Sequence, residues 1–199
     1  MALALILVAA YLIGSIPSAL WIGKLFYNKD IRQEGSGNLG TTNTFRVLGK
    51  PAGIVVLLMD ILKGTAAVLL VHLSYFADVS IHPLLLGMIA VIGHMYPIFA
   101  GFRGGKAVAT SAGVVLGYAP ILFISLAIIF VVLLKLFKMV SLSSILIAII
   151  AFLYSIVAYF YTGDWVFTLM IAVLATFIIY RHRENIQRIK NGTESKVNF

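Results

Sequence analysis

The sequence predicts an all-α integral membrane protein with about seven transmembrane helices. Of its 199 residues, 61% are hydrophobic and only 11% are charged, whereas a soluble domain usually carries about 25% charged residues. Six apolar stretches are as long, or nearly as long, as the roughly 20 residues that cross a bilayer as a helix, and they cover residues 2–23, 51–74, 81–101, 107–134, 140–161 and 164–180. These stretches are too numerous for the core of one soluble domain, so we expect a single transmembrane domain over residues 1–199.

Residues 2–23 are expected to form the first span. The alternative is a secretory signal peptide, but no basic residue precedes the apolar run and no clear small-residue cleavage site follows it. Pro17 lies inside this run, where we expect it to kink the helix. The chain has no cysteine, which excludes disulfides, thiolate catalysis and thiolate metal sites.

The stretch 107–134 is too long for one simple crossing, and Gly113, Gly117 and Pro120 interrupt it. One interpretation is a long, kinked helix. The other is a turn near residues 118–120 that separates a short helix, 107–118, from a full span, 120–137. The positive-inside rule favours the turn, because every basic loop then faces the cytoplasm, with the N-terminus outside and the C-terminus cytoplasmic. The basic residues concerned are Lys24, Lys29, Arg32, Arg46, Lys50, Arg103, Lys106, Lys135, Lys138, Arg181, Arg183, Arg188, Lys190 and Lys196.

The short helix has a consequence for the loop before it. A helix of about 12 residues covers only about 18 Å of a hydrocarbon core of roughly 30 Å. The segment 107–118 is therefore expected to start below the membrane surface, and the loop 102–106 to dip inward. Irregular backbone at that depth is tolerated only where protein or water satisfies its amides. The loop is thus a candidate pocket wall.

The first polar stretch is GSGNLGTTNTFR, residues 35–46. Its three glycines match GxGxxG, but the dinucleotide fingerprint requires a βαβ unit, and membrane spans flank this stretch. Glycines let backbone N–H groups approach an anion, and Thr41 to Asn43 are expected to open a helix whose N-terminus attracts it, with Arg46 one turn later. The alternative is an ordinary flexible loop of turn-forming residues.

The second polar stretch is GHMYPIFAGFRGGK, residues 93–106. It lacks the spacing of a nucleotide-binding P-loop. Lys106, beside two glycines, can still place a positive charge against a phosphate that the backbone also contacts. His94 is open to two interpretations, a hydrogen-bonded buried histidine or a functional one.

The third polar stretch is RHRENIQRI, residues 181–189, which we expect to continue the last span as a helix. His182, Asn185, Ile186 and Ile189 share one face, so the polar pair is expected to be buried. The alternative is a basic stop after a membrane helix, which explains the arginines but not that face.

Two ionisable residues, Asp60 and Lys63, lie at i,i+3 spacing inside the second span. Such groups usually face the bundle interior and pair with each other or line a path. We favour a structural pair over a role in chemistry.

Together, these stretches resemble a known family, the bacterial membrane acyl-phosphate:glycerol-3-phosphate acyltransferases called PlsY. The resemblance covers essentially the whole chain, through GSIPSA, GSGNLGTTNTFRVLG, DILKG, GHMYPIFAGFRGGKAVAT and RHRENIQRIKNGTE. It implies a seven-span enzyme of the bacterial inner membrane, with three cytoplasmic motifs. The implied reaction transfers a fatty acyl group from acyl phosphate to the sn-1 hydroxyl of glycerol 3-phosphate and gives lysophosphatidic acid, the first acylation of phospholipid synthesis. Ala107 departs from the family, where glycine is common, and we expect its methyl group to be tolerated.

The resemblance implies site residues by position. The catalytic candidates are Ser36, Arg46, Lys106, His182 and Asn185. The candidates for binding the substrates and their phosphates are Gly35, Gly37, Asn38, Gly40, Thr41, Thr42, Asn43, His94, Arg103, Gly104, Gly105 and Arg188. We expect the three motifs to converge into one cationic site. The expected partners are acyl phosphate, glycerol 3-phosphate and membrane lipid, with no nucleic acid, no obligate protein partner, no cofactor and no metal.

Several alternatives stay open. A substrate phosphate is our preferred acceptor for the hydroxyl proton, but His182 as general base and an acyl-enzyme on Ser36 compete with it. The main alternative from another class is a small transporter of a phosphorylated solute, since transporters also use broken helices that point at anions. The clustering of cationic residues on one side and the absence of paired halves disfavour a transporter.

Overall fold

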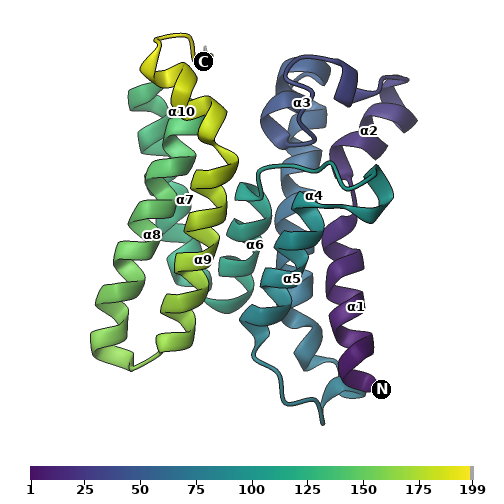
Figure 1. Cartoon of the computed structure of the whole chain (residues 1–199), viewed down its shortest axis with the longest axis vertical. Helices are drawn as coiled ribbons and strands as arrows, with labels where there is room; N and C mark the ends of the chain where they lie inside the picture. The colour runs from purple at the N-terminus through teal and green to yellow at the C-terminus, as the bar shows by residue number, and fades with distance from the viewer. Residues whose placement is uncertain (198–199) are drawn as a thin grey trace. The chain divides into compact units, whose positions relative to one another are not determined.

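The computed structural model describes residues 1–197, in which all the regular secondary structure is helical and no strand occurs (Figure 1). The helices form two compact units, Met1–Pro120 and the chain from Ile121 onward, each with its own internal packing. The expected all-α class is confirmed within the described residues. That both units belong to one functional domain stays a prediction.

Helix α4 is the centre of the first unit. It packs against α1, α2, α3, α5 and α6, while α1 also packs against α5. The α-helices of this unit are α1 (Ala2–Ser15), α2 (Ser18–Tyr27), α3 (Thr41–Leu48), α4 (Lys50–Leu69), α5 (Pro83–Met95) and α6 (Val108–Tyr118), and its short 3-10 helices are η1 (Ile31–Gln33), η2 (Leu70–His72), η3 (Ser74–Phe76) and η4 (Ile98–Ala100).

Glycines allow the helices of this unit to approach closely. A Cβ atom on Gly113 of α6 would overlap the carbonyl of Ile61 on α4, and one on Gly14 of α1 would overlap the backbone of Ala90 on α5. Small residues at helix contacts are typical of membrane bundles, where dispersion and close backbone approach replace the hydrophobic effect as the driving force. Gly113 thus lets α6 lie directly against the backbone of α4.

The first apolar stretch is broken at Pro17. Helix α1 ends at Ser15, α2 begins at Ser18, and the two helix axes differ by 48°. Proline lacks the N–H that would continue the helix ladder, so a carbonyl one turn earlier loses its partner. The kink predicted at this proline is confirmed.

The second unit is made of apolar helices followed by a polar tail. It contains α7 (Pro120–Phe137), α8 (Val140–Thr162), α9 (Trp165–Arg181) and α10 (Arg183–Lys190), and α8 packs against both α9 and α10. The Asp164 side chain caps α9 by accepting the N–H of Phe167 at 2.9 Å.

The helix break predicted near residues 118–120 is confirmed, because α6 ends at Tyr118, Ala119 is not helical and α7 starts at Pro120. The alternative prediction, a single long helix over residues 107–134, is wrong. Among residues 1–197, four helices are long and apolar enough to cross a membrane, or six if each of two bent pairs counts as one span, and α6 is a shorter apolar helix. The number of seven crossings and the orientation of the termini stay predictions.

Candidate functional site

Asn43 organises the first glycine-rich stretch. Its buried side chain donates to the carbonyl oxygens of Ile31 at 3.3 Å and Glu34 at 3.1 Å, and it accepts the N–H of Ser36 at 2.9 Å. The amide is thus committed to the backbone of the loop that carries Ser36. Asn43, which the sequence predicts as a binding candidate, therefore supports the backbone at Ser36.

The loop that carries Ser36 also requires glycine. Gly35 and Gly37 have φ values of 60° and 67°, in the left-handed region. A Cβ atom on Gly35 would overlap the Asn43 carboxamide oxygen. Helix α3 begins at Thr41, as predicted, and Arg46 is exposed in its last turn.

Arg32 precedes this stretch and is held by Asp30. Its Nε donates to Oδ1 at 2.9 Å and its Nη2 to Oδ2 at 2.6 Å, while its backbone N–H also donates to Oδ1 at 3.1 Å. The side-chain hydrogen bonds from Arg32 are the main reason that the pKa of Asp30 lies well below its ordinary value, and the same bonds raise the pKa of Arg32. The guanidinium is therefore both charged and oriented.

The second glycine-rich stretch folds back onto the end of α5. The N–H of Gly104 donates to the carbonyl oxygen of Met95 at 3.1 Å, and that of Gly105 donates to the carbonyl oxygen of His94 at 3.2 Å. A Cβ atom on Gly105 would overlap the His94 imidazole. These two amides bond to the end of α5. A role of Gly104 and Gly105 in phosphate binding stays a prediction. Because the two glycines have no side chains, this segment can lie directly on His94.

A cavity joins the first two stretches. Its volume is about 440 Å³, which falls in the usual range for small-molecule sites. Its lining residues are Arg32, Gln33, Ser36, Gly37, Asn38, Arg103 and Gly104. Hydroxyl, carboxamide and guanidinium groups thus surround one space, a combination suited to a phosphorylated ligand. Arg32 and Gln33 were missed from the sequence, since they lie just outside the glycine pattern.

Ala107 adopts a backbone conformation that favours glycine. Its φ is 63° and its ψ is 5°, immediately before α6 begins at Val108. The left-handed region costs a residue with a Cβ atom roughly 1–2 kcal/mol, and glycine loses part of this advantage through its larger unfolded-state entropy.

We expect Ala107→Gly to raise the free energy of unfolding by up to about 1 kcal/mol, because it removes this backbone strain. Thermal unfolding in detergent measures the change. Ala109→Gly, inside the first turn of α6, is the matched control and should lower stability by a similar amount. A lower thermal unfolding midpoint for Ala107→Gly than for the wild type would contradict the prediction of backbone strain at Ala107.

The third stretch contains a helix break that the sequence did not predict. Helix α9 ends at Arg181, α10 starts at Arg183, and their axes differ by 56°. The expected continuous helix through 181–189 is therefore wrong. The His182 Nδ1 atom lies 2.7 Å from the carbonyl oxygen of Ile178, so the imidazole bonds to the helix backbone at the bend. The predicted burial of His182 and Asn185 is confirmed, with exposed fractions of 4% and 7%.

Glu194 is the centre of a polar cluster in the second unit. Its Oε1 accepts hydrogen bonds from Ser141 Oγ and Asn185 Nδ2, both at 2.6 Å, and its Oε2 accepts one from Arg188 Nε at 2.8 Å. Burial disfavours the charged carboxylate, but the three hydrogen bonds outweigh it and hold the pKa of Glu194 below its ordinary value of 4.5. Two predicted site residues, Asn185 and Arg188, are thus fixed by a carboxylate that the sequence reasoning did not single out.

Glu194→Gln is expected to lower the free energy of unfolding of the second unit by about 1.5–3 kcal/mol, the usual worth of hydrogen bonds to a charged group. Because its folded pKa is depressed, the carboxylate stabilises the protein above its ordinary pKa of 4.5, and this contribution is lost as the pH falls through the lower folded value. Thermal unfolding across this range should show a wild-type midpoint that falls more steeply than the variant's. Glu184→Gln, on the exposed face of α10, is the control, and equal pH dependence in wild type and Glu194→Gln would refute the assignment.

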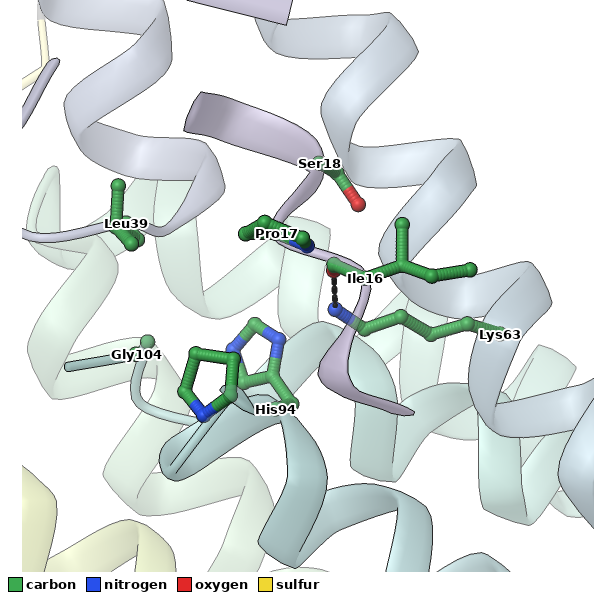
Figure 2. Close-up of a pocket in the computed structure, with 9 residues that line it drawn as sticks. Ile16, Pro17, Ser18, Leu39, Lys63, His94 and Gly104 are labelled. Atoms are coloured by element: carbon green, nitrogen blue, oxygen red, sulfur yellow. Dashed lines mark hydrogen bonds between the residues drawn. The ribbon is translucent and has the colours of Figure 1, made fainter. Parts of the chain in front are cut away.

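The predicted pair of Asp60 and Lys63 is confirmed, with Lys63 Nζ and Asp60 Oδ1 2.8 Å apart. The Lys63 ammonium also donates to the carbonyl oxygen of Ile16 at 2.9 Å, at the break between α1 and α2 (Figure 2). Ser18 Oγ donates to Asp60 Oδ1 at 2.8 Å, and His94 Nδ1 lies 3.8 Å from the same oxygen. Within residues 1–197, no group of three or more His, Asp or Glu side chains is placed to hold a metal ion.

Comparison with known proteins identifies relatives along the whole chain. Residues 4–192 match the family described as glycerol-3-phosphate acyltransferase. Curated proteins of that name include one from Enterococcus faecalis, 58% identical over 205 residues covering 100% of this chain and 94% of the relative. Another from Listeria monocytogenes is 55% identical over 200 residues covering 99% and 98%.

Two solved structures are also similar, and both are crystal structures of PlsY (YgiH), an integral membrane glycerol 3-phosphate acyltransferase. The glycerol 3-phosphate form has a TM-score of 0.88 and 40% identity, covering 98% of this chain and 95% of that chain. The lysophosphatidic acid form has a TM-score of 0.83 and 39% identity, with the same coverage.

Proposed function

This chain belongs to the PlsY family of integral membrane glycerol-3-phosphate acyltransferases, and we propose that it transfers a fatty acyl group from acyl phosphate to the sn-1 hydroxyl of glycerol 3-phosphate. In this reaction, the hydroxyl oxygen forms an ester bond with the acyl carbon. The bond between that carbon and the bridging phosphate oxygen breaks, and inorganic phosphate leaves. The hydroxyl proton passes to a phosphate, and the lipid product is lysophosphatidic acid.

The observation that carries this proposal is the cavity between the first two glycine-rich stretches. It places Ser36 beside two arginine residues, Arg32 and Arg103. Both substrates carry phosphate, and guanidinium groups bind phosphate by paired, charge-assisted hydrogen bonds. The relatives crystallised in glycerol 3-phosphate and lysophosphatidic acid forms support the same choice of acceptor and product.

The reaction requires the protein mainly to position its two substrates. Acyl phosphate is already an activated mixed anhydride, so the site needs to align the acceptor hydroxyl and stabilise the charge that develops on phosphate. We assign this work to Ser36, Arg46, Lys106, His182 and Asn185. The acyl tail can stay among lipids beside the apolar helices while its phosphate reaches the polar loops. The enzyme would thus work in the bacterial inner membrane with its site facing the cytoplasm.

We assign the role of proton acceptor to a substrate phosphate. The His182 Nδ1 atom faces a backbone carbonyl oxygen, which only accepts hydrogen bonds, so this nitrogen carries a proton and acts as a donor. This bond fixes the orientation of the ring and leaves Nε2 as the nitrogen that can accept a hydrogen bond. The assignment to phosphate therefore rests on the substrates, which bring their own basic oxygens to the hydroxyl, and the next experiment separates the two acceptors.

His182→Gln is therefore expected to keep kcat within about tenfold of the wild type, whereas removing a general base costs about 100- to 10,000-fold. The rate of inorganic phosphate release at saturating substrates measures the effect. A loss of more than about 100-fold, with unchanged thermal stability, would favour histidine as the base.

The direct test of the function uses purified protein in detergent. With acyl phosphate and glycerol 3-phosphate, we expect equal amounts of lysophosphatidic acid and inorganic phosphate, and with acyl-CoA as donor we expect neither. A transporter of phosphorylated solutes would release no phosphate under either condition. Product formation from acyl-CoA alone would contradict the proposed donor.

A further inference from the structure

A second group of polar side chains lies inside the first unit, and none of its members lines the cavity that contains Ser36. It consists of Ser18, Asp60, Lys63 and His94, with exposed fractions of 2%, 1%, 5% and 6%. Three segments of the chain meet here, namely the α1–α2 break, α4 and α5, and the Ile16 carbonyl at the break also joins the group. The proposed reaction gives no chemical step to Ser18, Asp60 or Lys63, while His94 is also a binding candidate from the sequence.

The cluster is costly to maintain in an apolar bundle. A buried ion pair has lost its hydration, and it is tolerated only where further hydrogen bonds satisfy both partners. Here, Asp60 Oδ1 accepts from both Ser18 Oγ and Lys63 Nζ, and the ammonium also donates to the Ile16 carbonyl. A well-packed apolar set of similar volume would stabilise the bundle at least as well. A function other than stability is therefore needed to explain the charges.

His94 connects this cluster to the glycine-rich segment that carries Lys106. Its Nδ1 atom lies 3.8 Å from Asp60 Oδ1, an electrostatic contact longer than a hydrogen bond. The other edge of the same ring, which includes Nε2, packs against Gly105, and the His94 carbonyl oxygen accepts the N–H of Gly105 at 3.2 Å. The imidazole thus has the charged cluster at one edge and the glycine segment at the other.

A small cavity marks the place where these parts meet (Figure 2). Its volume is about 10 Å³, close to the space that a single water molecule requires. Ser18, Lys63 and His94 line it together with Gly104 and Gly105. The backbone of the segment therefore rests on polar groups whose positions are set by the ion pair.

We propose that Ser18, Asp60 and Lys63 form a positioning cluster that, through His94, fixes the backbone of residues 104–106 for substrate phosphate binding. This proposal rests on the proposed function, since it assigns the reason for holding Lys106 in place. The ion pair orients the imidazole, the imidazole supports Gly105, and Gly105 determines where the next residue stands. None of the three cluster residues needs to touch a substrate.

The test removes both charges at once. Asp60→Asn combined with Lys63→Met keeps the side-chain volumes and leaves no unpaired buried charge, so the thermal unfolding midpoint in detergent should stay within a few degrees of the wild type. We expect kcat/KM for acyl transfer to fall about 100-fold, because small displacements of a binding group have effects of that size. A double variant that keeps both its stability and its activity would overturn the proposal.

A second readout does not depend on activity. The chain has no cysteine, so a spin label can be attached to Phe102→Cys alone, at a position that is 57% exposed in the wild type. The double variant should make this label more mobile and leave a label at Leu73→Cys, which is 52% exposed near the other end of α4, unchanged. Unchanged mobility at position 102 would contradict the positioning role. If the wild-type protein makes no lysophosphatidic acid, the proposed function fails, while the label still tests this inference.

Two further variants complete the design. Ser18→Ala removes one hydrogen bond to Asp60 and should show the same pattern with a several-fold loss of kcat/KM, so it stands in if the double variant does not fold. Thr65→Val is the matched control on α4, because Thr65 Oγ1 donates to the Gly113 carbonyl at 2.9 Å, a helix contact that does not reach the glycine segment. We expect Thr65→Val to change stability without changing kcat/KM. A loss of kcat/KM in Thr65→Val as large as that in Ser18→Ala would show that general packing explains both.

Discussion

Lys106→Met is expected to lower kcat/KM for acyl transfer by about 100- to 1,000-fold, the usual cost of losing one group that stabilises developing charge. The substrate phosphates each bring close to two negative charges, and the leaving phosphate gains charge as the anhydride bond breaks. Lys106 follows a segment that is anchored by the bonds of Gly104 and Gly105 to the end of α5. The methionine keeps the length of the side chain and removes its charge. The initial rate of phosphate release at several substrate concentrations gives kcat and KM separately.

Lys50→Met is the control for Lys106→Met. Lys50 is the exposed first residue of α4, so the loss of its charge should change kcat/KM by less than about threefold, as is usual for exposed charges. Lys106→Arg should recover part of the activity, since the charge is kept but its geometry differs. If Lys106→Met kept wild-type kcat and KM, Lys106 would not be part of the site.

The second large effect is expected for Asn43→Ala. The substitution removes three hydrogen bonds, one from the N–H of Ser36 and one to each of the carbonyl oxygens of Ile31 and Glu34. The two carbonyl oxygens each keep a backbone N–H donor. A hydrogen bond typically contributes about 0.5–1.5 kcal/mol, so the loss of three is expected to lower the free energy of unfolding by about 2–4 kcal/mol. The thermal unfolding midpoint in detergent measures this loss.

Asn43→Ala should also reduce kcat/KM at temperatures where the variant is folded, because the side chain at position 43 no longer accepts the backbone N–H of Ser36. The control is Asn191→Ala, an exposed asparagine just after α10, for which neither stability nor activity should change measurably. A variant at position 43 that is destabilised but fully active would show that the loop does not depend on Asn43 for its active geometry.

The helix breaks show what the sequence can predict and where it fails. The breaks at Pro17 and before Pro120 follow from a residue that lacks an N–H, so they are local and were predicted. The break at His182 coincides with an imidazole that bonds to the carbonyl oxygen of Ile178, and no proline or other residue type marks it in the sequence. Similarly, the pairing of Asp60 with Lys63 follows from helical spacing, but the contacts with Ser18 and the Ile16 carbonyl depend on how other helices pack.

The site shows the same limit. Residues of both glycine-rich stretches line one cavity, but the bonds from Gly104 and Gly105 to the end of α5 were not predicted. Glu194 and Ser141 are 53 residues apart, so their hydrogen bond could only be found in three dimensions. Convergence of the third stretch with the first two stays a prediction from the sequence.

A structure of the protein with bound glycerol 3-phosphate tests the central claim most directly. We predict that the phosphate lies in the cavity between the two glycine-rich stretches, with a nitrogen of Arg103 or Lys106 within hydrogen-bond distance and the glycerol hydroxyls near Ser36. A phosphate bound away from both residues, with the cavity still empty at saturating ligand, would contradict the proposed site.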